Sequence, residues 1–256
     1  MGQIRVERTH EGLAARVLID RPDKMNAMTV DMRAAFGEVV HELSGDEKVR
    51  AIVVRGVGDK AFSAGGDVAQ FLDLAPHDLV DWGKEMEAAA TCPKPVIAAI
   101  DGFCLGAGFE LALACDIRIA TDRSLFALPE VRLGMMPGSG GSQRLLRLIG
   151  PGRAKYWLLT GRRMDAAEAE RIGIVSKVAA PGDLEAAVEE LVREFLKLSP
   201  LSLRVLKRTL HEGADAPLGT AIELERKAYA YLRSTRDYEE GVRSFIEKRP
   251  PKFEGK

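Results

Sequence analysis

Apolar residues are spaced differently in the two parts of the chain. In the first part, short apolar runs that predict strands alternate with segments of helical spacing, an order typical of an α/β protein. The predicted strands are Gln3–Thr9, Ala14–Ile19, Ala51–Val54, Val96–Ile100, Asp116–Ala120 and Leu125–Ala127. The predicted helices run from an N-cap at Thr29 to Leu43, over Leu79–Ala90, from the glycine-rich turn Gly102–Gly108 to Ala114, and over Gln143–Ile149. Loops are predicted at Phe62–Asp67 and Pro137–Gly141.

From Pro151 onward the pattern becomes mostly helical. Helical spacing is found at Ala154–Thr160, Ala166–Arg171, Asp183–Leu198, Leu201–His211, Gly219–Arg233 and Tyr238–Lys248. We therefore expect a core of alternating strands and helices over residues 1–195 and a helical region over residues 196–256.

Composition and charge exclude several classes of protein. A chain of 256 residues with an apolar fraction of 46% is long enough to bury a large core. Its formal net charge of −1 offers no field that would recruit nucleic acid or an anionic membrane. The longest apolar stretch, Pro95–Ala114, is interrupted by Asp101 and Glu110, so no run approaches the roughly 20 residues of a membrane span.

The cysteines and histidines do not indicate a catalytic or metal site. Cys92, Cys104 and Cys115 each stand in an apolar stretch, which indicates reduced and buried thiols. The four histidines have no zinc-ligand spacing, so we expect no metal site. The first residues lack the basic and apolar regions of a secretory signal, and we expect a cytoplasmic protein.

Two glycine-containing loops could stabilise a negative charge. Gly65-Gly66 and Gly106-Ala107-Gly108 allow the backbone to approach a ligand closely, and N–H groups at a helix start favour an anion. Taken alone, each loop could equally reflect close packing. The glycines beginning at Gly106 do not make a dinucleotide fingerprint, because Leu111 stands at the third glycine position.

Two carboxyl groups could perform acid–base chemistry beside these loops. Glu110 lies in an apolar helical run, where desolvation should raise its pKa, and Glu130 follows Pro129 between apolar stretches. The alternatives are ordinary, since Glu110 could lie on a solvated helix face and Glu130 could cap a turn.

Taken together, these segments resemble the crotonase superfamily, also called the enoyl-CoA hydratase/isomerase family. Arg21–Met28 is similar to the family's R-P-x-x-x-N-A segment. The resemblance continues through Ala61–Asp67, Asp101–Asp116 and Pro129–Leu145. It ends at Thr235–Pro250, which is similar to the family's D-x-x-E-G-x-x-x-F-x-E-K-R tail, so it covers nearly the whole chain.

The resemblance implies a crotonase-like spiral of β-β-α units with a C-terminal helical region that forms a homo-trimer or a dimer of trimers. It implies an oxyanion hole at the N–H groups of Gly66 and Ala107. Two departures, Gly66 for alanine and Ala107 for glycine, both retain an N–H group. The CoA and substrate site implied by the resemblance comprises Lys24, Asn26, Ala27, Ala64, Gly65, Asp67, Val68, Gly106, Phe245 and Lys248.

The presence of both Glu110 and Glu130 matches the hydratases of the family. The resemblance therefore implies syn addition of water to a trans-2-enoyl-CoA through an enolate, with the CoA thioester as substrate and no further cofactor. A double-bond isomerase, a carnitinyl-CoA dehydratase and a cyclic-enoyl-CoA hydratase are the alternatives within the family. A non-catalytic acyl-CoA- or RNA-binding protein and a trimeric scaffold are less favoured, because they leave the two glutamates unexplained. The segment Val68–Ala90 is expected to shape the acyl pocket.

Overall fold

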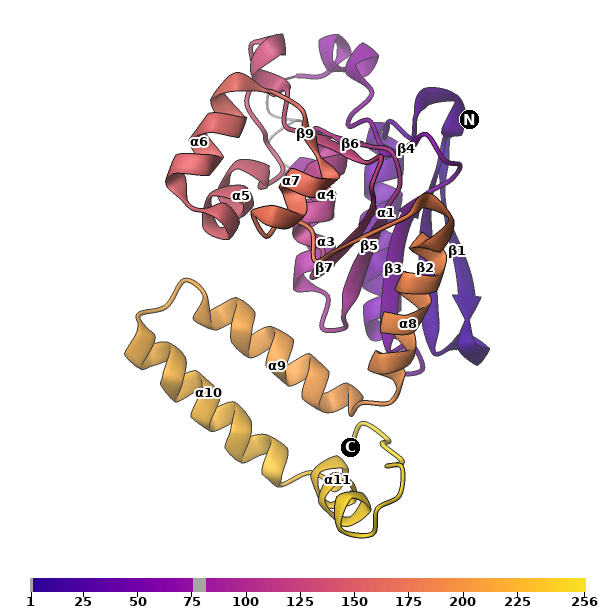
Figure 1. Cartoon of the computed structure of the whole chain (residues 1–256), viewed down its shortest axis with the longest axis vertical. Coiled ribbons are helices and arrows are strands. Elements are labelled where there is room, and N and C mark those ends of the chain that lie inside the picture. Colours follow the sequence, from indigo (N-terminus) through magenta and orange to yellow (C-terminus); the bar gives the residue numbers. More distant parts are fainter. Residues whose placement is uncertain (1, 76–81) are drawn as a thin grey trace. The chain divides into compact units, whose positions relative to one another are not determined.

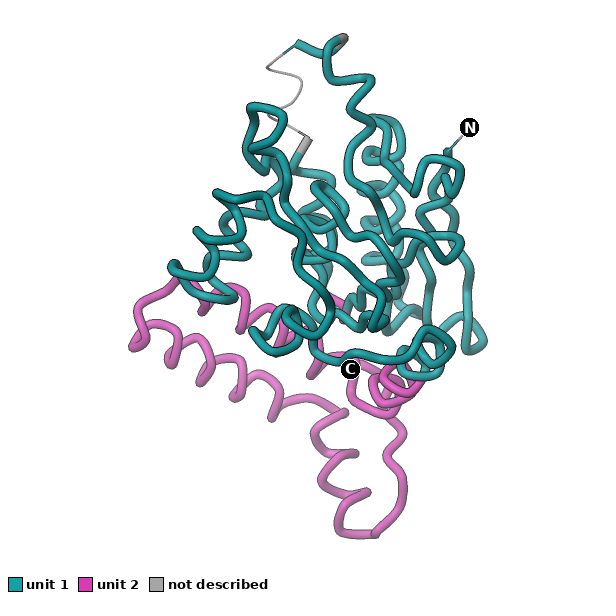
Figure 2. Tube along the Cα trace, turned by 45° about the horizontal axis from the view of Figure 1, so that its top comes forward, with its two compact units in different colours: residues 1–92, 96–189 teal, residues 93–95, 190–256 magenta. Residues whose placement is uncertain are grey.

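Residues 2–75 and 82–256 are described by the computed structural model. The chain divides into two compact units, shown in Figure 2, one of residues 1–92 and 96–189 and the other of residues 93–95 and 190–256. The division at residue 195 that we expected from the sequence stays a prediction.

The first unit contains two sheets, and among the described residues the larger has six strands (Figure 1). Their order is β1 (Gln3–Thr9), β2 (Ala14–Asp20), β3 (Ala51–Gly56), β5 (Val96–Ile100), β7 (Ile117–Thr121) and β10 (Lys177–Ala179). β1 and β2 are antiparallel, and every other neighbouring pair is parallel. β5 is buried along its whole length, as expected for a parallel strand with both faces covered.

The smaller sheet consists of very short strands. Its order in the described residues is β4 (Ala61–Ser63), β6 (Phe103–Leu105), β8 (Leu125–Ala127) and β9 (Met164–Asp165). The first three are parallel and β9 is antiparallel to β8. The chain therefore visits the larger sheet at β3, β5 and β7 and the smaller sheet directly afterwards at β4, β6 and β8, which gives a repeated β-β unit.

Along the chain, helices lie between these pairs of strands and complete the core. The helices that begin in the first unit are α1 (Val30–Gly45), α3 (Trp82–Thr91), α4 (Ala107–Ala114), α5 (Gly141–Ile149), α6 (Pro151–Thr160), α7 (Ala166–Arg171) and α8 (Leu184–Leu196). Short 3₁₀ turns lie at His10–Gly12, Pro22–Lys24, Val68–Asp73, Glu130–Leu133 and Pro181–Asp183. Thr29 caps α1 by accepting the N–H of Met32, as predicted, and α4 is buried on every side.

Some boundaries differ from those predicted. Ala61–Ser63 and Phe103–Leu105 are strands rather than loop and turn, and α5 begins at Gly141 instead of Gln143. β9 and β10 were not predicted. The predicted start of the helix Leu79–Ala90 lies outside the described residues. All three cysteines are buried, as predicted.

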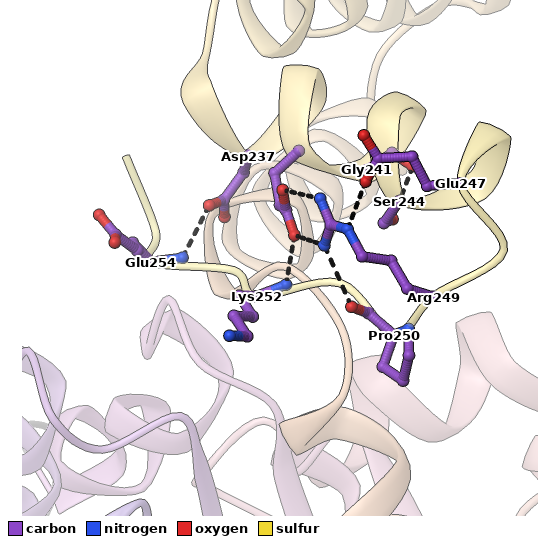
Figure 3. Close-up of polar contacts among 9 residues, drawn as sticks. Asp237, Gly241, Ser244, Glu247, Arg249, Pro250, Lys252 and Glu254 are labelled. Carbon is purple, nitrogen blue, oxygen red and sulfur yellow. Dashed lines mark hydrogen bonds and ion pairs between the residues drawn. The ribbon is translucent and has the colours of Figure 1, made fainter.

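The second unit is a helical region, with the boundary between the units falling inside α8. α9 (Pro200–Gly213) and α10 (Leu218–Arg233) lie side by side, and α11 (Arg236–Ile246) begins two residues earlier than predicted. Within this unit the C-terminal residues fold back onto α11 (Figure 3). Asp237 accepts the N–H of Glu254 at 2.8 Å, and Arg249 forms an ion pair with Glu240 at 2.6 Å.

In the described part of the chain, no helix is long and apolar enough to cross a membrane. The same residues contain no group of three or more histidine, cysteine, aspartate or glutamate side chains that could hold a metal ion.

One buried arginine fixes the end of α4. The guanidinium of Arg118 donates to the carbonyl oxygens of Ala112 at 3.1 Å, Cys115 at 2.7 Å and Ile174 at 2.6 Å. It therefore ties the last turn of α4 to the segment that precedes β10, and satisfies carbonyls that a helix end leaves without partners.

We predict that Arg118→Met lowers the free energy of unfolding by about 3 kcal/mol, because several buried carbonyls lose their donors together. Urea denaturation at fixed protein concentration measures this loss. Arg123→Met is the matched control, since the exposed Arg123 pairs with Asp101 at the surface and its removal should change stability little. Equal effects of the two substitutions would contradict the anchoring role of Arg118.

Candidate active site

The carboxyl ends of three parallel strands bring the predicted site residues together. Ala64–Gly66 follows β4, Gly106 and Ala107 follow β6, and Glu130 comes shortly after β8. Because β4, β6 and β8 are paired in parallel, these three segments emerge at the same edge of the smaller sheet.

A cavity of about 220 Å³ lies at this edge. It is lined by Arg33, Ala64, Gly65, Gly66, Val68, Phe71, Gly106, Ala107, Glu110, Pro129, Glu130, Leu133, Met135, Met136, Gly138 and Ser139. The lining therefore includes both predicted acids, both predicted oxyanion positions, and Ala64, Gly65, Val68 and Gly106. Most of the exposed surface inside the cavity is apolar.

The two glycine-containing loops approach each other closely. Gly65 has φ of +110°, and a Cβ atom there would lie 3.1 Å from the carbonyl oxygen of Leu105 and 3.5 Å from the amide nitrogen of Ala107. Ala107 is the first residue of α4, so its N–H has no acceptor within the helix. Within the described residues, neither this N–H nor that of Gly66 has a hydrogen-bond acceptor. Two backbone donors are thus available at one side of the cavity.

Glu110 is held rigidly in its buried position. Only 3% of the residue is exposed, and its Oε1 atom accepts the N–H groups of Ser139 at 2.7 Å and Gly141 at 2.9 Å. A Cβ atom on Gly141 would lie 2.7 Å from Cγ of Glu110, so glycine is required there for the carboxylate to occupy this place. Two hydrogen bonds to one oxygen therefore fix the position of this carboxyl group. The alternative of a solvated helix face for Glu110 is therefore wrong.

Glu130 has a different environment. Burial raises the pKa of its carboxyl to about 7, the negative charge of Glu110 adds to this, and a hydrogen bond from its own backbone N–H opposes it. Its Oε2 atom is buried and has no hydrogen-bond partner among the described residues. Glu130 can therefore hold or release a proton near neutral pH, beside a carboxylate that is fixed by backbone donors.

Arg33 also lines the cavity, although no part of the sequence reasoning singled it out. It lies on α1 and is 3% exposed. Its position in the sequence could have indicated that it is buried. Arg33 precedes the buried Phe36 by three residues and Val40 by seven, so it belongs to the apolar face of the helix. The N–H groups of Ser139 and Gly141 were also missed as partners of Glu110.

Several residues of the predicted CoA site have other contacts. The Asn26 side chain is buried and bonds to the backbone of Arg21, Val57 and Ala61, and thereby shapes its own loop. Asp67 pairs with Arg21 at 2.8 Å.

Lys24 and Ala27 of that predicted set are not among the residues that line the cavity. Lys24 is exposed and Ala27 is half-buried. Phe245 and Lys248 belong to the second unit. The predicted roles of all these residues in binding CoA stay predictions.

Comparison with known proteins identifies the class. A family model described as enoyl-CoA hydratase/isomerase matches residues 9–256. The short-chain-enoyl-CoA hydratase of Clostridium acetobutylicum is 37% identical over 249 residues, which cover 96% of this chain and 95% of that protein. The crotonyl-CoA hydratase of Syntrophomonas wolfei is 39% identical over 243 residues, which cover 93% of this chain and 94% of that protein.

Solved structures agree with this assignment. The crystal structure of an enoyl-CoA hydratase from Bacillus anthracis matches with a TM-score of 0.95 at 33% identity, over 99% of this chain and 100% of that one. The chain belongs to the enoyl-CoA hydratase/isomerase family. The predicted crotonase-like α/β fold is confirmed by this match.

We predict that Glu130 titrates with a midpoint near pH 7, followed by NMR of protein carrying ¹³C-labelled glutamate carboxyl groups. Glu130→Gln assigns the signal by removing it. Glu110→Gln should lower the midpoint, because it removes the repulsion, but leave it above the ordinary value, because burial is the larger cause. A midpoint at the ordinary value in the unmodified protein would refute this account of the site.

Proposed function

We propose that the chain catalyses the reversible syn addition of water to a trans-2-enoyl-CoA, giving a 3-hydroxyacyl-CoA. The observation that carries this proposal is the cavity in which two carboxyl groups in different environments face a pair of backbone N–H donors. Hydration needs these parts together, since one group must accept a proton from water while another delivers a proton to Cα. A structural scaffold would need neither acid.

Each of these groups has one role in the proposed mechanism. The thioester oxygen accepts the N–H groups of Gly66 and Ala107, which stabilise the negative charge of the enolate. The Glu110 carboxylate takes a proton from water as the water oxygen bonds to Cβ, and the electrons of the double bond move to the enolate. Protonated Glu130 then gives its proton to Cα as the enolate collapses. A proton returns from Glu110 to Glu130 before the next turnover, so the cycle consumes water alone.

The relatives support the class of reaction. Proteins covering nearly the whole chain are named short-chain-enoyl-CoA hydratase and crotonyl-CoA hydratase, and the prediction of an enoyl-CoA hydratase is confirmed at this level. Those names, together with a cavity of about 220 Å³, lead us to propose a short acyl chain as the substrate. A double-bond isomerase is the alternative, and incubation with crotonyl-CoA tests it, because hydration gives a product heavier by one water and isomerisation does not.

We further propose that the CoA thioester is bound without an additional cofactor and that residues 196–256 mediate a homo-trimer or a dimer of trimers. Large apolar side chains exposed in the single chain support the second point: Leu206, Leu210, Leu218, Tyr229, Phe245 and Ile246. The binding of CoA by Lys24, Asn26, Ala27, Asp67, Phe245 and Lys248 is part of the proposal by family resemblance. Location in the cytoplasm stays a prediction.

Glu110→Gln and Glu130→Gln should each lower kcat for crotonyl-CoA hydration by roughly 10²–10⁴-fold, because each amide loses an essential proton transfer. The affinity for the CoA thioester should change little, and loss of the enoyl-thioester absorbance measures the rate. Glu87→Gln is the control, since this exposed glutamate lies on α3 outside the cavity. Near-normal turnover in either cavity variant would contradict the paired-acid mechanism.

The pH dependence of kcat/KM should fall on the alkaline side with an inflection near pH 7. Below this pH the pair holds one proton on Glu130, whose pKa is about 7, and above it the proton needed at Cα is lost. Hydration and dehydration should show the same inflection, because water addition releases no net proton. Initial rates measured in both directions from pH 5.5 to about 9 test this, and a flat profile would rule out Glu130 as the proton donor.

A further inference from the structure

The proposed reaction leaves unexplained a cation in the wall of the cavity. The Nη2 atom of Arg33 lies 2.6 Å from the position that a Cβ atom on Gly66 would take, and the Phe71 ring lies 2.8 Å from that position. The guanidinium therefore occupies space that is open because residue 66 has no side chain. This places a cation beside one of the two proposed oxyanion donors and in the same cavity as Glu110.

Carboxyl groups face Arg33 from the neighbouring elements. Glu110 on α4 and Glu85 on α3 both favour its charged form, while burial lowers the pKa of Arg33 to about 10. Glu85 is brought close by packing of α3 on α1, since its Cβ lies 3.2 Å from the position of a Cβ on Gly37, one helical turn beyond Arg33. Glu130 faces the same cavity from the turn after β8. Arg33 therefore remains a cation at neutral pH.

We propose that Arg33 is a positioning residue whose cation, held beside Gly66, opposes the negative charge of the two acids that share its cavity, Glu110 and Glu130. This inference rests on the proposed hydration by Glu110 and Glu130. Burial of a carboxyl group as deep as that of Glu110 is costly unless hydrogen bonds or an opposing charge compensate for the lost water. The N–H groups of Ser139 and Gly141 supply the hydrogen bonds and Arg33 supplies the charge.

The charges around Arg33 argue against another possible role for this residue, the binding of an anionic acyl group. One cation already faces two carboxylates, and Glu130 adds a further negative charge whenever it is ionised. A substrate carboxylate would add another anion to a cavity whose exposed surface is mostly apolar. The arrangement favours an uncharged acyl chain.

Arg33→Met and Arg33→Lys separate charge from packing. Arg33→Met should lower kcat for crotonyl-CoA about tenfold, with a smaller change in KM, and raise the alkaline inflection of kcat/KM by roughly one pH unit. The reason is that the doubly ionised pair loses its opposing charge and so keeps its last proton to higher pH. Arg33→Lys should restore the inflection and most of the rate. An unchanged inflection in Arg33→Met, or a lysine variant as slow as the methionine variant, would overturn the proposal.

A second measurement separates this inference from the proposed function. The NMR midpoint of Glu130 should rise in Arg33→Met whether or not the protein turns over crotonyl-CoA, whereas failure of the unmodified protein to hydrate any enoyl-CoA would refute the function alone. Melting temperatures check that the variants fold, and Arg33→Gln serves as a second neutral variant. If Arg33→Met slows an enoyl-CoA with a distal carboxylate but leaves crotonyl-CoA unaffected, Arg33 binds substrate and the proposal is wrong.

Discussion

Parallel pairing of three very short strands is the constraint on which the site depends. β4, β6 and β8 each span three residues, and Phe103 pairs with Ala61 on one side and Leu125 on the other. The pairing fixes where each strand ends, so the segments that follow must emerge together. Donors and acids that are distant in sequence thereby share one cavity of about 220 Å³. The larger sheet supports this arrangement, because β4, β6 and β8 follow its strands β3, β5 and β7 in turn.

The proposed chemistry depends on two similar carboxyl groups that lie in different environments. Glu110 accepts two backbone N–H groups, whereas one buried oxygen of Glu130 has no hydrogen-bond partner in the part of the chain that the structure describes. Equal environments would give two carboxyl groups with the same preference for a proton, and neither would be suited to a separate task. The difference has two sources: the backbone N–H groups of Ser139 and Gly141 that hold Glu110, and the burial that raises the pKa of Glu130.

The sequence predicts the order of strands and helices well, because buried parallel strands and amphipathic helices have clear periods. It predicts poorly the short strands at Ala61–Ser63 and Phe103–Leu105, whose glycine-rich neighbours resemble turns. The motifs indicated residues that meet in the cavity, among them both acids and both glycine-containing loops. The backbone donors to Glu110 could not be predicted, because every residue except proline has a backbone N–H group. The pattern of side chains does not show which of these groups will donate to Glu110. Arg33 was not predicted, because it lies on a helix face whose other residues are typical of a buried core.

The contact between Arg33 and Gly66 also constrains how this sequence could change over generations. A methyl group at position 66 would lie 2.6 Å from Nη2 of Arg33, so alanine there would require the end of this flexible side chain to move. The fold could accommodate that change. The cation, however, would no longer lie where it does now, beside the backbone donor of residue 66.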